Sequence, residues 1–342
     1  MESSPVVRAD DGRRPFKVAV IHDYLGIAEA SADWSPVKAL AEVDFISQPL
    51  TDEDAIVEAL AEYDVISSMR ERLPLTASLM DRLPRLRCFV ATSQSNRVID
   101  FAAAEQRGIE IAATANGSLA RAATAELTWG LIIAATRGIV AEDRAIREGK
   151  WQTGVFPTLY GRTIGILGLG GTGRYIARFA REFGMRVLAH SPHLSEMDAV
   201  EGGAELVGLE ELLERSDVVT IHLVLSEATR HIVDSRGIAR MKPSAVLVNT
   251  SRGPLVDESA LIEALRDRRI AGAALDVFDV EPLPAGHPLT ELDNVILSPH
   301  SGGFTEETYR VWYQGSADAV QAFLEGRDIP IRHYARASEA SR

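Results

Sequence analysis

The sequence predicts an α/β fold with two doubly wound domains, each built on a parallel β-sheet. Three observations support this prediction. The chain has 342 residues, enough for two domains with hydrophobic cores of their own. Short apolar runs alternate with amphipathic stretches from one end to the other, as in strands and helices that alternate around a parallel sheet. A glycine-rich turn at residues 168–173 follows about 160 residues of chain, so a further domain precedes it.

The first domain begins with a strand at residues 17–21. Later apolar runs of similar length predict further strands, and the stretches between them predict helices. The strands are expected at 64–67, 87–91 and 108–112, and the helices at 52–61 and 76–83. A long helical pattern from about 119 to 149 then predicts a single helix that connects the two domains.

The second domain is expected to hold the strands on either side of the glycine-rich turn, at 163–167, 186–189, 218–222, 245–249, 272–276 and 294–297. A helix predicted at 306–325 returns after the last strand and could close the first domain. The first domain is therefore assigned to residues 17–115 and 305–334, and the second to residues 116–304. The polar ends, residues 1–15 and 335–342, are expected to be flexible.

The glycine-rich turn has the spacing Gly168-x-Gly170-x-x-Gly173 and lies between an apolar run and an amphipathic stretch. This is the strand–turn–helix setting that a dinucleotide-binding loop requires. Gly168 allows the tight turn, and Gly170 has no side chain to keep a pyrophosphate away from the helix N-terminus. Gly173 lets the helix pack closely on the strand. The loop therefore predicts a Rossmann domain that binds a dinucleotide.

Arg252, Glu281 and His300 each follow a late strand of the second domain, where open parallel sheets place their ligands. An arginine fork can hold a carboxylate and polarise a neighbouring carbonyl. A histidine can supply a proton near neutral pH, and a carboxylate beside it stabilises the imidazolium. The set suits hydride transfer to a 2-oxo acid. Taken singly, each residue also has a structural interpretation: a surface turn for Arg252, a solvated loop for Glu281 and a strand cap for His300.

With these residues in place, the sequence resembles the D-isomer-specific 2-hydroxyacid dehydrogenase family over roughly residues 17–330. The resemblance implies that the Rossmann domain is inserted into a flavodoxin-like substrate domain, and that the protein is a homodimer. It implies that Arg252 binds substrate, that His300 is the acid/base and that Glu281 is its partner. The residues that it assigns to the cofactor site are Gly168, Gly170, Thr172, Gly173, Ser191, His222, Thr229, Thr250, Ser251, Arg252, Asp276, His300 and Gly302.

The first domain departs from the family pattern. Members carry a glycine-rich loop whose backbone N–H groups meet the substrate carboxylate, whereas the corresponding stretch here, Thr92–Asn96, contains no glycine. We therefore expect side chains to take part. Arg70 could meet a second acidic group of the substrate, or form a surface salt bridge with Glu71. The predicted substrate-binding residues are Arg70, Ser93, Gln94, Ser95, Arg252 and His300.

The choice of nicotinamide depends on the residue that follows the second strand of the nucleotide domain. NAD-selective sites place a carboxylate there, on the adenosine ribose. This sequence has Ser191 at that place, flanked by His190 and followed by His193. A 2′-phosphate is therefore not repelled, but no arginine follows directly to clamp it. The cofactor is predicted to be NAD or NADP, with NADP slightly favoured.

The composition of the chain disfavours some classes of binding partner. A formal net charge of −13 disfavours nucleic acid and anionic membranes. The single cysteine, Cys88, lies in an apolar run and excludes an intrachain disulfide, and no apolar run reaches membrane-spanning length. We expect a cytoplasmic protein without a metal site.

The expected activity is hydride transfer from NAD(P)H to a small 2-oxo acid, giving a D-2-hydroxy acid. Two alternatives stay open. The same fold occurs in corepressor-like interaction proteins that sense NAD(H), which would bind partners without turning over a 2-oxo acid. Formate dehydrogenases share the fold as well, but they place glutamine beside the histidine, and Glu281 weighs against them.

Overall fold

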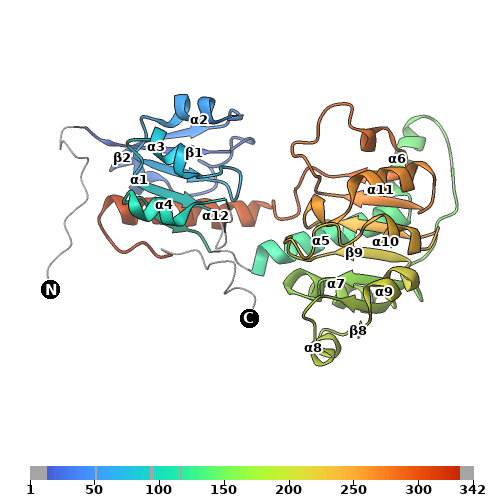
Figure 1. Cartoon of the computed structure of the whole chain (residues 1–342). Coiled ribbons are helices and arrows are strands. Elements are labelled where there is room, and N and C mark those ends of the chain that lie inside the picture. The colour runs from blue at the N-terminus through green and yellow to red at the C-terminus, as the bar shows by residue number, and fades with distance from the viewer. Residues whose placement is uncertain (1–13, 51, 93–95, 97, 116–117, 332–342) are drawn as a thin grey trace. The chain divides into compact units, whose positions relative to one another are not determined.

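The computed structural model describes residues 14–331, apart from 51, 93–95, 97 and 116–117. Most of the ends predicted to be flexible therefore lie outside the described residues. The chain forms two compact units (Figure 1). The split unit comprises Met1–Leu119 and Thr305–Arg342, and the continuous unit comprises Ala120–Phe304. These units divide the chain after residues 119 and 304, against predicted divisions after 115 and 304.

The split unit contains a parallel sheet in the order β2-β1-β3-β4-β5, the flavodoxin-like order. Helices cover both faces of the sheet, and α12 packs against β4 and β5. The strands are β1 (Phe16–Ile21), β2 (Ala41–Ile46), β3 (Val65–Ser68), β4 (Cys88–Ala91) and β5 (Glu110–Ala113). The helices are α1 (Ser35–Lys38), α2 (Glu53–Leu60), α3 (Ala77–Arg82), α4 (Phe101–Gln106) and α12 (Glu306–Leu324).

Strand β2 was not predicted, and its place in the sheet explains why. It lies at the edge and pairs only with β1, from Phe16 opposite Ala41 to Ile21 opposite Ile46. Its side chains alternate between the interior and solvent, so it has no continuous apolar run. The central strands β3 and β4 are buried along their whole length and were found from their apolar runs.

The continuous unit contains a parallel sheet in the order β12-β11-β10-β9-β6-β7-β8. Apart from the outermost strand β12, this is the Rossmann order 3-2-1-4-5-6. The strands are β6 (Thr163–Leu167), β7 (Arg186–His190), β8 (Glu205–Leu206), β9 (Val218–Ile221), β10 (Val246–Asn249), β11 (Gly272–Leu275) and β12 (Val295–Leu297). The helices are α6 (Ile139–Arg147), α7 (Gly171–Glu182), α8 (Glu196–Glu201), α9 (Leu209–Arg215), α10 (Ser235–Arg240) and α11 (Glu258–Arg266), with short 3₁₀ turns at Gly253–Leu255 and Pro288–Glu291.

The prediction of one helix from 119 to 149 is wrong. The segment forms α5 (Ser118–Thr136), which links the two units along the chain, and then α6. The break lies at Gly138, whose backbone is left-handed with φ +62°. Such a residue cannot continue a right-handed helix. A Cβ at this position would also lie 2.1 Å from Cε1 of Phe156, so the Phe156 ring would have to move to admit any other residue.

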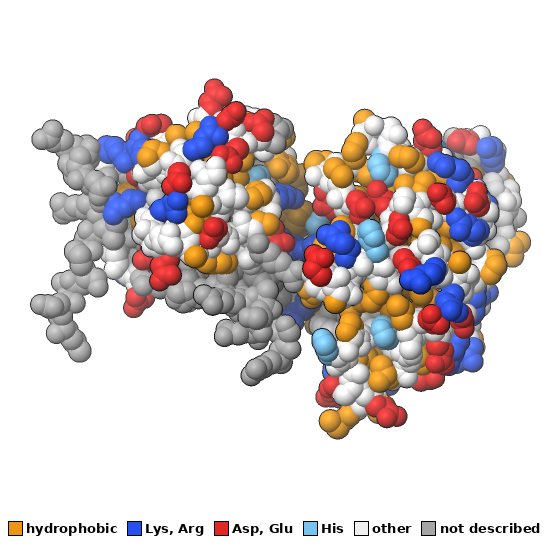
Figure 2. Space-filling model, viewed as in Figure 1, with side chains coloured by type: hydrophobic (Ala, Val, Ile, Leu, Met, Phe, Trp, Pro, Cys, Tyr) orange, Lys and Arg blue, Asp and Glu red, His pale blue; other side chains and the backbone are white. Residues whose placement is uncertain are grey.

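The carboxyl ends of β10, β11 and β12 lie side by side, because these three strands are neighbours in the sheet. Their registers are in step, with Asn249 opposite Leu275 and Leu275 opposite Leu297. The loops that carry Arg252, Glu281 and His300 therefore leave the sheet at one edge. On the face of the molecule that Figure 2 shows, acidic and basic side chains are interspersed over both units.

Candidate active site

The glycine loop joins β6 to α7 and is shaped by contacts that exclude side chains. Gly168 has φ +99°, and a Cβ there would lie 2.7 Å from the backbone carbonyl carbon of His222. A Cβ on Gly173 would lie 2.1 Å from the carbonyl oxygen of Gly168, so this glycine lets α7 meet the loop. Gly170 is different, because a Cβ there would meet no heavy atom within 4 Å. The loop is closed toward the protein and open outward at the helix N-terminus, which fits a pyrophosphate.

Ser191 lies beside this loop. Gly168 donates its backbone N–H to the carbonyl of His190 at 2.8 Å, which places the carboxyl end of β7 against the glycine turn. The ring of His190 is oriented by Nδ1, which donates to the carbonyl of Val207 at 3.1 Å. Ser191 is partly exposed. Thr172 lies in the first turn of α7. These predicted cofactor residues therefore share one edge of the sheet.

The segment after β9 borders the same loop. His222 donates its backbone N–H to Leu167, and its Nε2 lies 3.0 Å from Oγ1 of Thr220. Burial lowers the pKa of His222 to about 3, so its imidazole is neutral. Thr229 holds the following turn: its hydroxyl accepts from the N–H of Ser226 and donates to the carbonyl of Val224. The Thr229 hydroxyl is therefore already engaged inside its own loop.

Two hydroxyls fix the loop after β10. Ser251 donates to the carbonyl of Leu223 at 2.6 Å, and the hydroxyl oxygens of Thr250 and Thr128 are 2.7 Å apart. Thr250 is buried. These contacts tie the loop before Arg252 to the segment after β9 on one side and to α5 on the other.

Asp276 ties the loops after β11 and β12 together. Its carboxylate is fully buried, and its two oxygens accept the backbone N–H groups of Ser301 and Gly302, each at 2.9 Å. A Cβ on Gly302 would lie 3.1 Å from Oδ2 of Asp276, so glycine gives the closest fit. The loop that bears His300 is thereby fixed to the end of β11.

His300 and Glu281 form a hydrogen-bonded pair in the continuous unit. Nδ1–H of His300 donates to Oε2 of Glu281 at 2.6 Å. Oε1 of Glu281 accepts the backbone N–H of Phe278 at 3.0 Å, so both carboxylate oxygens are held. Both side chains are about one-third exposed. Since Nδ1 faces Glu281, Nε2 is the ring nitrogen left for a reacting group.

Arg252 approaches this pair from the neighbouring strand. A Cβ on Gly253 would lie 2.1 Å from the backbone carbonyl carbon of Phe278, so the loop after β10 presses directly on the loop that carries Glu281. Burial opposes ionisation of Glu281. The hydrogen bond and charge of His300, the N–H of Phe278 and the charge of Arg252 outweigh it and hold the pKa of Glu281 below its usual range. A carboxylate, an imidazole and a guanidinium thus interact at the edge of the sheet where the strands have their carboxyl ends.

The substrate residues predicted in the split unit are described only in part. Ser93, Gln94 and Ser95 lie outside the described residues. Arg70 has a left-handed backbone with φ +53°, and the residues that flank the undescribed stretch hold it. Its N–H donates to the hydroxyl of Thr92 at 2.9 Å, and its carbonyl accepts from the side-chain amide of Asn96 at 2.9 Å. Cζ of Arg70 lies 5.7 Å from the ring centroid of Trp312.

Sequence reasoning missed a polar network at the end of β1. His22 is buried with φ +64°, and its Nδ1 lies 3.1 Å from the hydroxyl of Ser68 at the end of β3. Arg72 donates to the carbonyl of His22 at 3.1 Å, and its Cζ lies 4.8 Å from the ring centroid of Tyr24. Asp23 accepts the backbone N–H groups of Ile27 and Ala28. The run His22-Asp23-Tyr24 directly after an apolar strand was the available signal.

Comparison with known proteins tests the predicted family membership of the chain. The family model for "D-isomer specific 2-hydroxyacid dehydrogenase, NAD binding domain" matches residues 129–302, slightly more than half of the chain. The match includes the glycine loop and all three of Arg252, Glu281 and His300.

The chain belongs to the D-isomer-specific 2-hydroxyacid dehydrogenase family.

Named relatives of this family are similar over part of their length. A glyoxylate reductase of Aeropyrum pernix is 44% identical over 217 residues, which are 61% of this chain and 65% of that protein. A D-3-phosphoglycerate dehydrogenase of Methanocaldococcus jannaschii is 40% identical over 231 residues, 67% of this chain and 44% of that protein. The chain thus spans less than two thirds of the length of these two relatives.

A solved structure extends the similarity over nearly the whole chain. The phosphoglycerate oxidoreductase of Vibrio cholerae superposes with a TM-score of 0.84 at 32% identity, covering 91% of this chain and 99% of that one. The predicted family and the predicted fold class of two parallel-sheet α/β domains are confirmed.

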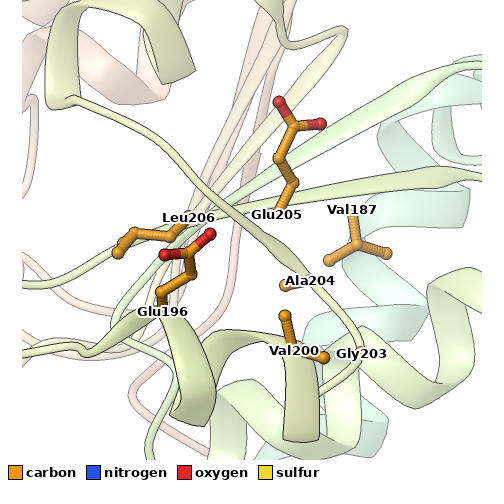
Figure 3. A pocket seen from close by; sticks show the side chains of 7 residues that line it. All are labelled: Val187, Glu196, Val200, Gly203, Ala204, Glu205 and Leu206. Carbon is orange, nitrogen blue, oxygen red and sulfur yellow. The ribbon is translucent and has the colours of Figure 1, made fainter.

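A pocket of about 650 Å³ lies elsewhere on this dehydrogenase-family domain, at the outer edge of the sheet (Figure 3). Its lining comes from α8, β8 and the start of β7, and its charged side chains are the carboxylates of Glu196 and Glu205. Val187, near the amino end of β7, marks the side opposite the glycine loop. Two carboxylates repel an anionic dinucleotide, so this pocket is not the cofactor site.

The described part of the chain contains neither a membrane-spanning helix nor a cluster of metal ligands. No helix there has the length and apolar character needed to cross a bilayer. No three His, Cys, Asp or Glu side chains among those residues gather so that they could hold a metal ion.

Proposed function

We propose that this protein is an oxidoreductase that reduces a small 2-oxo acid to a D-2-hydroxy acid with NAD(P)H. The observation that carries the proposal is the His300–Glu281 hydrogen bond of 2.6 Å, with Arg252 close enough to lower the pKa of Glu281. The pair lies on the family's NAD-binding domain. A site that only senses a nucleotide has no need of a paired acid beside a guanidinium.

Each of the three residues has a role in this reaction. The reduced nicotinamide, when bound, supplies a hydride. Arg252 binds the substrate carboxylate and polarises the adjacent carbonyl, because its fork can donate to both groups. Protonated His300 delivers the proton to the new hydroxyl oxygen from Nε2, since Nδ1–H is directed to Glu281. Glu281 stays ionised, fixes the ring orientation and stabilises the imidazolium.

The remaining predicted residues are proposed to hold the cofactor and the rest of the substrate. Gly168, Gly170, Thr172 and Gly173 would hold the pyrophosphate, and Asp276 and Gly302 fix the loop of His300. In the split unit we propose Arg70 with Ser93, Gln94 and Ser95 as further substrate contacts. Glyoxylate and hydroxypyruvate are the first substrates to test, because the Aeropyrum relative is named a glyoxylate reductase.

We further propose that the site accepts NADP as well as NAD, with NADP slightly favoured. Ser191 stands at the carboxyl end of β7 beside Gly168, and it carries no charge to repel a 2′-phosphate. Assays with NADH and NADPH at equal concentration test this. A strong preference for NADH would remove the argument from Ser191.

We propose a cytoplasmic homodimer. Large apolar side chains are exposed on α6 and the segment after it, including Ile139, Ile146 and Trp151. A second copy would remove this apolar surface from water. The proposed cytoplasmic location is supported by the single cysteine, Cys88, which is fully buried in β4. Burial raises the pKa of its thiol. Light scattering on the purified protein measures the assembly, and a monomer at micromolar concentration would contradict it.

The decisive experiment is a kinetic screen of 2-oxo acids with both cofactors, together with His300→Ala. We expect turnover of at least one small 2-oxo acid, and a loss of roughly 10²–10⁴-fold in kcat for the variant, which should still bind the cofactor. Full turnover without His300 would remove it from the mechanism. Cofactor binding with no turnover across the screen would favour the interaction-protein alternative.

A further inference from the structure

Arg121, in the first turns of α5, reaches the glycine loop. A Cβ on Gly171 would lie 2.5 Å from Cδ of Arg121, 3.0 Å from Nη1 and 3.3 Å from Nε. The arginine therefore fills the space that a side chain at 171 would need. Gly171 is the first residue of α7, so a guanidinium from one helix lies beside the N-terminus of another within the continuous unit.

This arrangement is mildly unfavourable without an anion, because Arg121 is exposed and water screens its charge in part. A helix N-terminus carries roughly half a positive charge, so a cation placed there is repelled. Arg174 of the same helix is paired with Glu201 at 3.4 Å. Among the described residues, no carboxylate lies within ion-pair distance of Arg121. Two positive groups therefore meet with no negative group of the protein between them.

There is room for an anion at this place. The position of Gly170, one residue before Gly171, is open, with no heavy atom within 4 Å of a Cβ built there. The first backbone N–H groups of α7 have no acceptor within their own helix. A phosphate seated here would accept hydrogen bonds from these groups and from the guanidinium.

We propose that Arg121 binds the pyrophosphate of the dinucleotide where the glycine loop enters α7. The absence of a side chain at Gly171 makes room for it. This inference rests on the proposed function, because it needs a dinucleotide in the site. It adds to the loop a charged contact supplied by the helix that links the two units.

The test measures ligand binding to the purified apoprotein by titration calorimetry. For Arg121→Ala we expect the dissociation constants of ADP-ribose and NADH to rise by about tenfold. Adenosine, which has no phosphate, should bind as it does to the unchanged protein. The salt dependence of ADP-ribose binding should become weaker, since one cation is lost. Arg236→Ala removes the same charge from an exposed residue of α10 and should change none of these values.

Two further measurements separate binding from a structural role. The melting temperature of the Arg121→Ala apoprotein should be unchanged or higher, because a cation leaves a helix N-terminus. A lower melting temperature with weaker adenosine binding would show a structural role and overturn the proposal. Gly171→Ala should weaken ADP-ribose binding in the unchanged protein, but have little effect in the Arg121→Ala background, since the displaced group is already gone.

The outcomes distinguish the two proposals. If the unchanged protein binds neither NADH nor NADPH, the proposed function fails. If it binds them and Arg121→Ala binds ADP-ribose equally well, only the role of Arg121 fails.

Discussion

At the carboxyl ends of their strands, side-chain hydrogen bonds hold loops in both units, and the continuous unit adds close backbone contacts at its glycines. In the continuous unit, Gly168, Gly173 and Gly253 bring backbone within 3 Å of the positions where their side chains would begin. In the split unit, side chains hold the loops: Thr92 and Asn96 bind the backbone of Arg70, and Ser68 meets His22. Glycines at fixed spacing are visible in a sequence, whereas hydrogen bonds between ordinary polar residues are not. This explains why one unit could be interpreted in detail and the other only in outline.

The largest expected difference between the units concerns the reaction. Arg252→Lys should lower kcat/KM on the order of 10²–10³-fold, because lysine cannot bind the carboxylate and the carbonyl together. Arg70→Lys should lower kcat/KM by about tenfold, mostly through a higher KM. The proposed contact of Arg70 is with a part of the substrate away from the reacting carbonyl, and lysine keeps the positive charge. Steady-state kinetics on the best 2-oxo acid measure both. A larger loss of kcat/KM for Arg70→Lys than for Arg252→Lys would mean that the main substrate contacts lie in the split unit.

The next comparison is between two glycines. Gly173→Ala should lower the free energy of unfolding by about 3 kcal/mol, because its Cβ would lie 2.1 Å from a carbonyl oxygen. Gly108→Ala should cost only about 1 kcal/mol, since its left-handed φ of +66° is strained but its surroundings are open. Urea unfolding of both variants gives the two values. Equal costs would show that close backbone contact does not distinguish the glycine loop.

A smaller difference is expected for two threonines. Thr92→Val leaves the N–H of Arg70 without its acceptor and should cost about 1–2 kcal/mol, with a higher substrate KM. Thr250→Val should cost less, about 0.5–1 kcal/mol, because its partner Thr128 still donates to the carbonyl of Thr124. Denaturant unfolding and steady-state kinetics check the pair. If Thr92→Val is neutral in both, side-chain bonds do not hold the loop of the split unit.

The smallest expected effect concerns how the stability of the folded protein depends on pH. Burial, and then the charge of Arg72, lower the pKa of His22 to about 4. In the unfolded chain a histidine titrates near about 6.5, so between these values the unfolded state binds a proton that the folded state does not. Stability should therefore fall as pH is lowered from 7 toward 4.

His22→Asn should remove this part of the pH dependence, and asparagine tolerates the left-handed backbone. The difference in melting temperature between the unchanged protein and the variant should shrink by on the order of 2 °C from pH 7 to pH 5. Calorimetric melting across this range measures it. A difference independent of pH would mean that His22 is protonated in the folded state.

Prediction from the sequence succeeded where a local pattern is sufficient. The apolar run at 163–167 is β6, and the run at 245–249 contains β10, because strands buried on both faces read as continuous apolar segments. The edge strands β2 and β8 were missed, since an edge strand is partly exposed and, in β8, only two residues long. The break at Gly138 was missed because the helical pattern continues on both sides of it, and Phe156, which fills the space there, is distant in sequence.

The sequence by itself determined the α/β class, the dinucleotide loop and the placement of Arg252, Glu281 and His300 after consecutive strands. These follow from local spacing and from the rule that parallel strands end at one edge. Only the tertiary structure decided which atoms meet: His300 Nδ1 with Glu281, Asp276 with the loop of Gly302, and Arg121 with the space above Gly171. Such contacts join residues far apart in the chain, and their distances depend on how strands and helices pack in three dimensions.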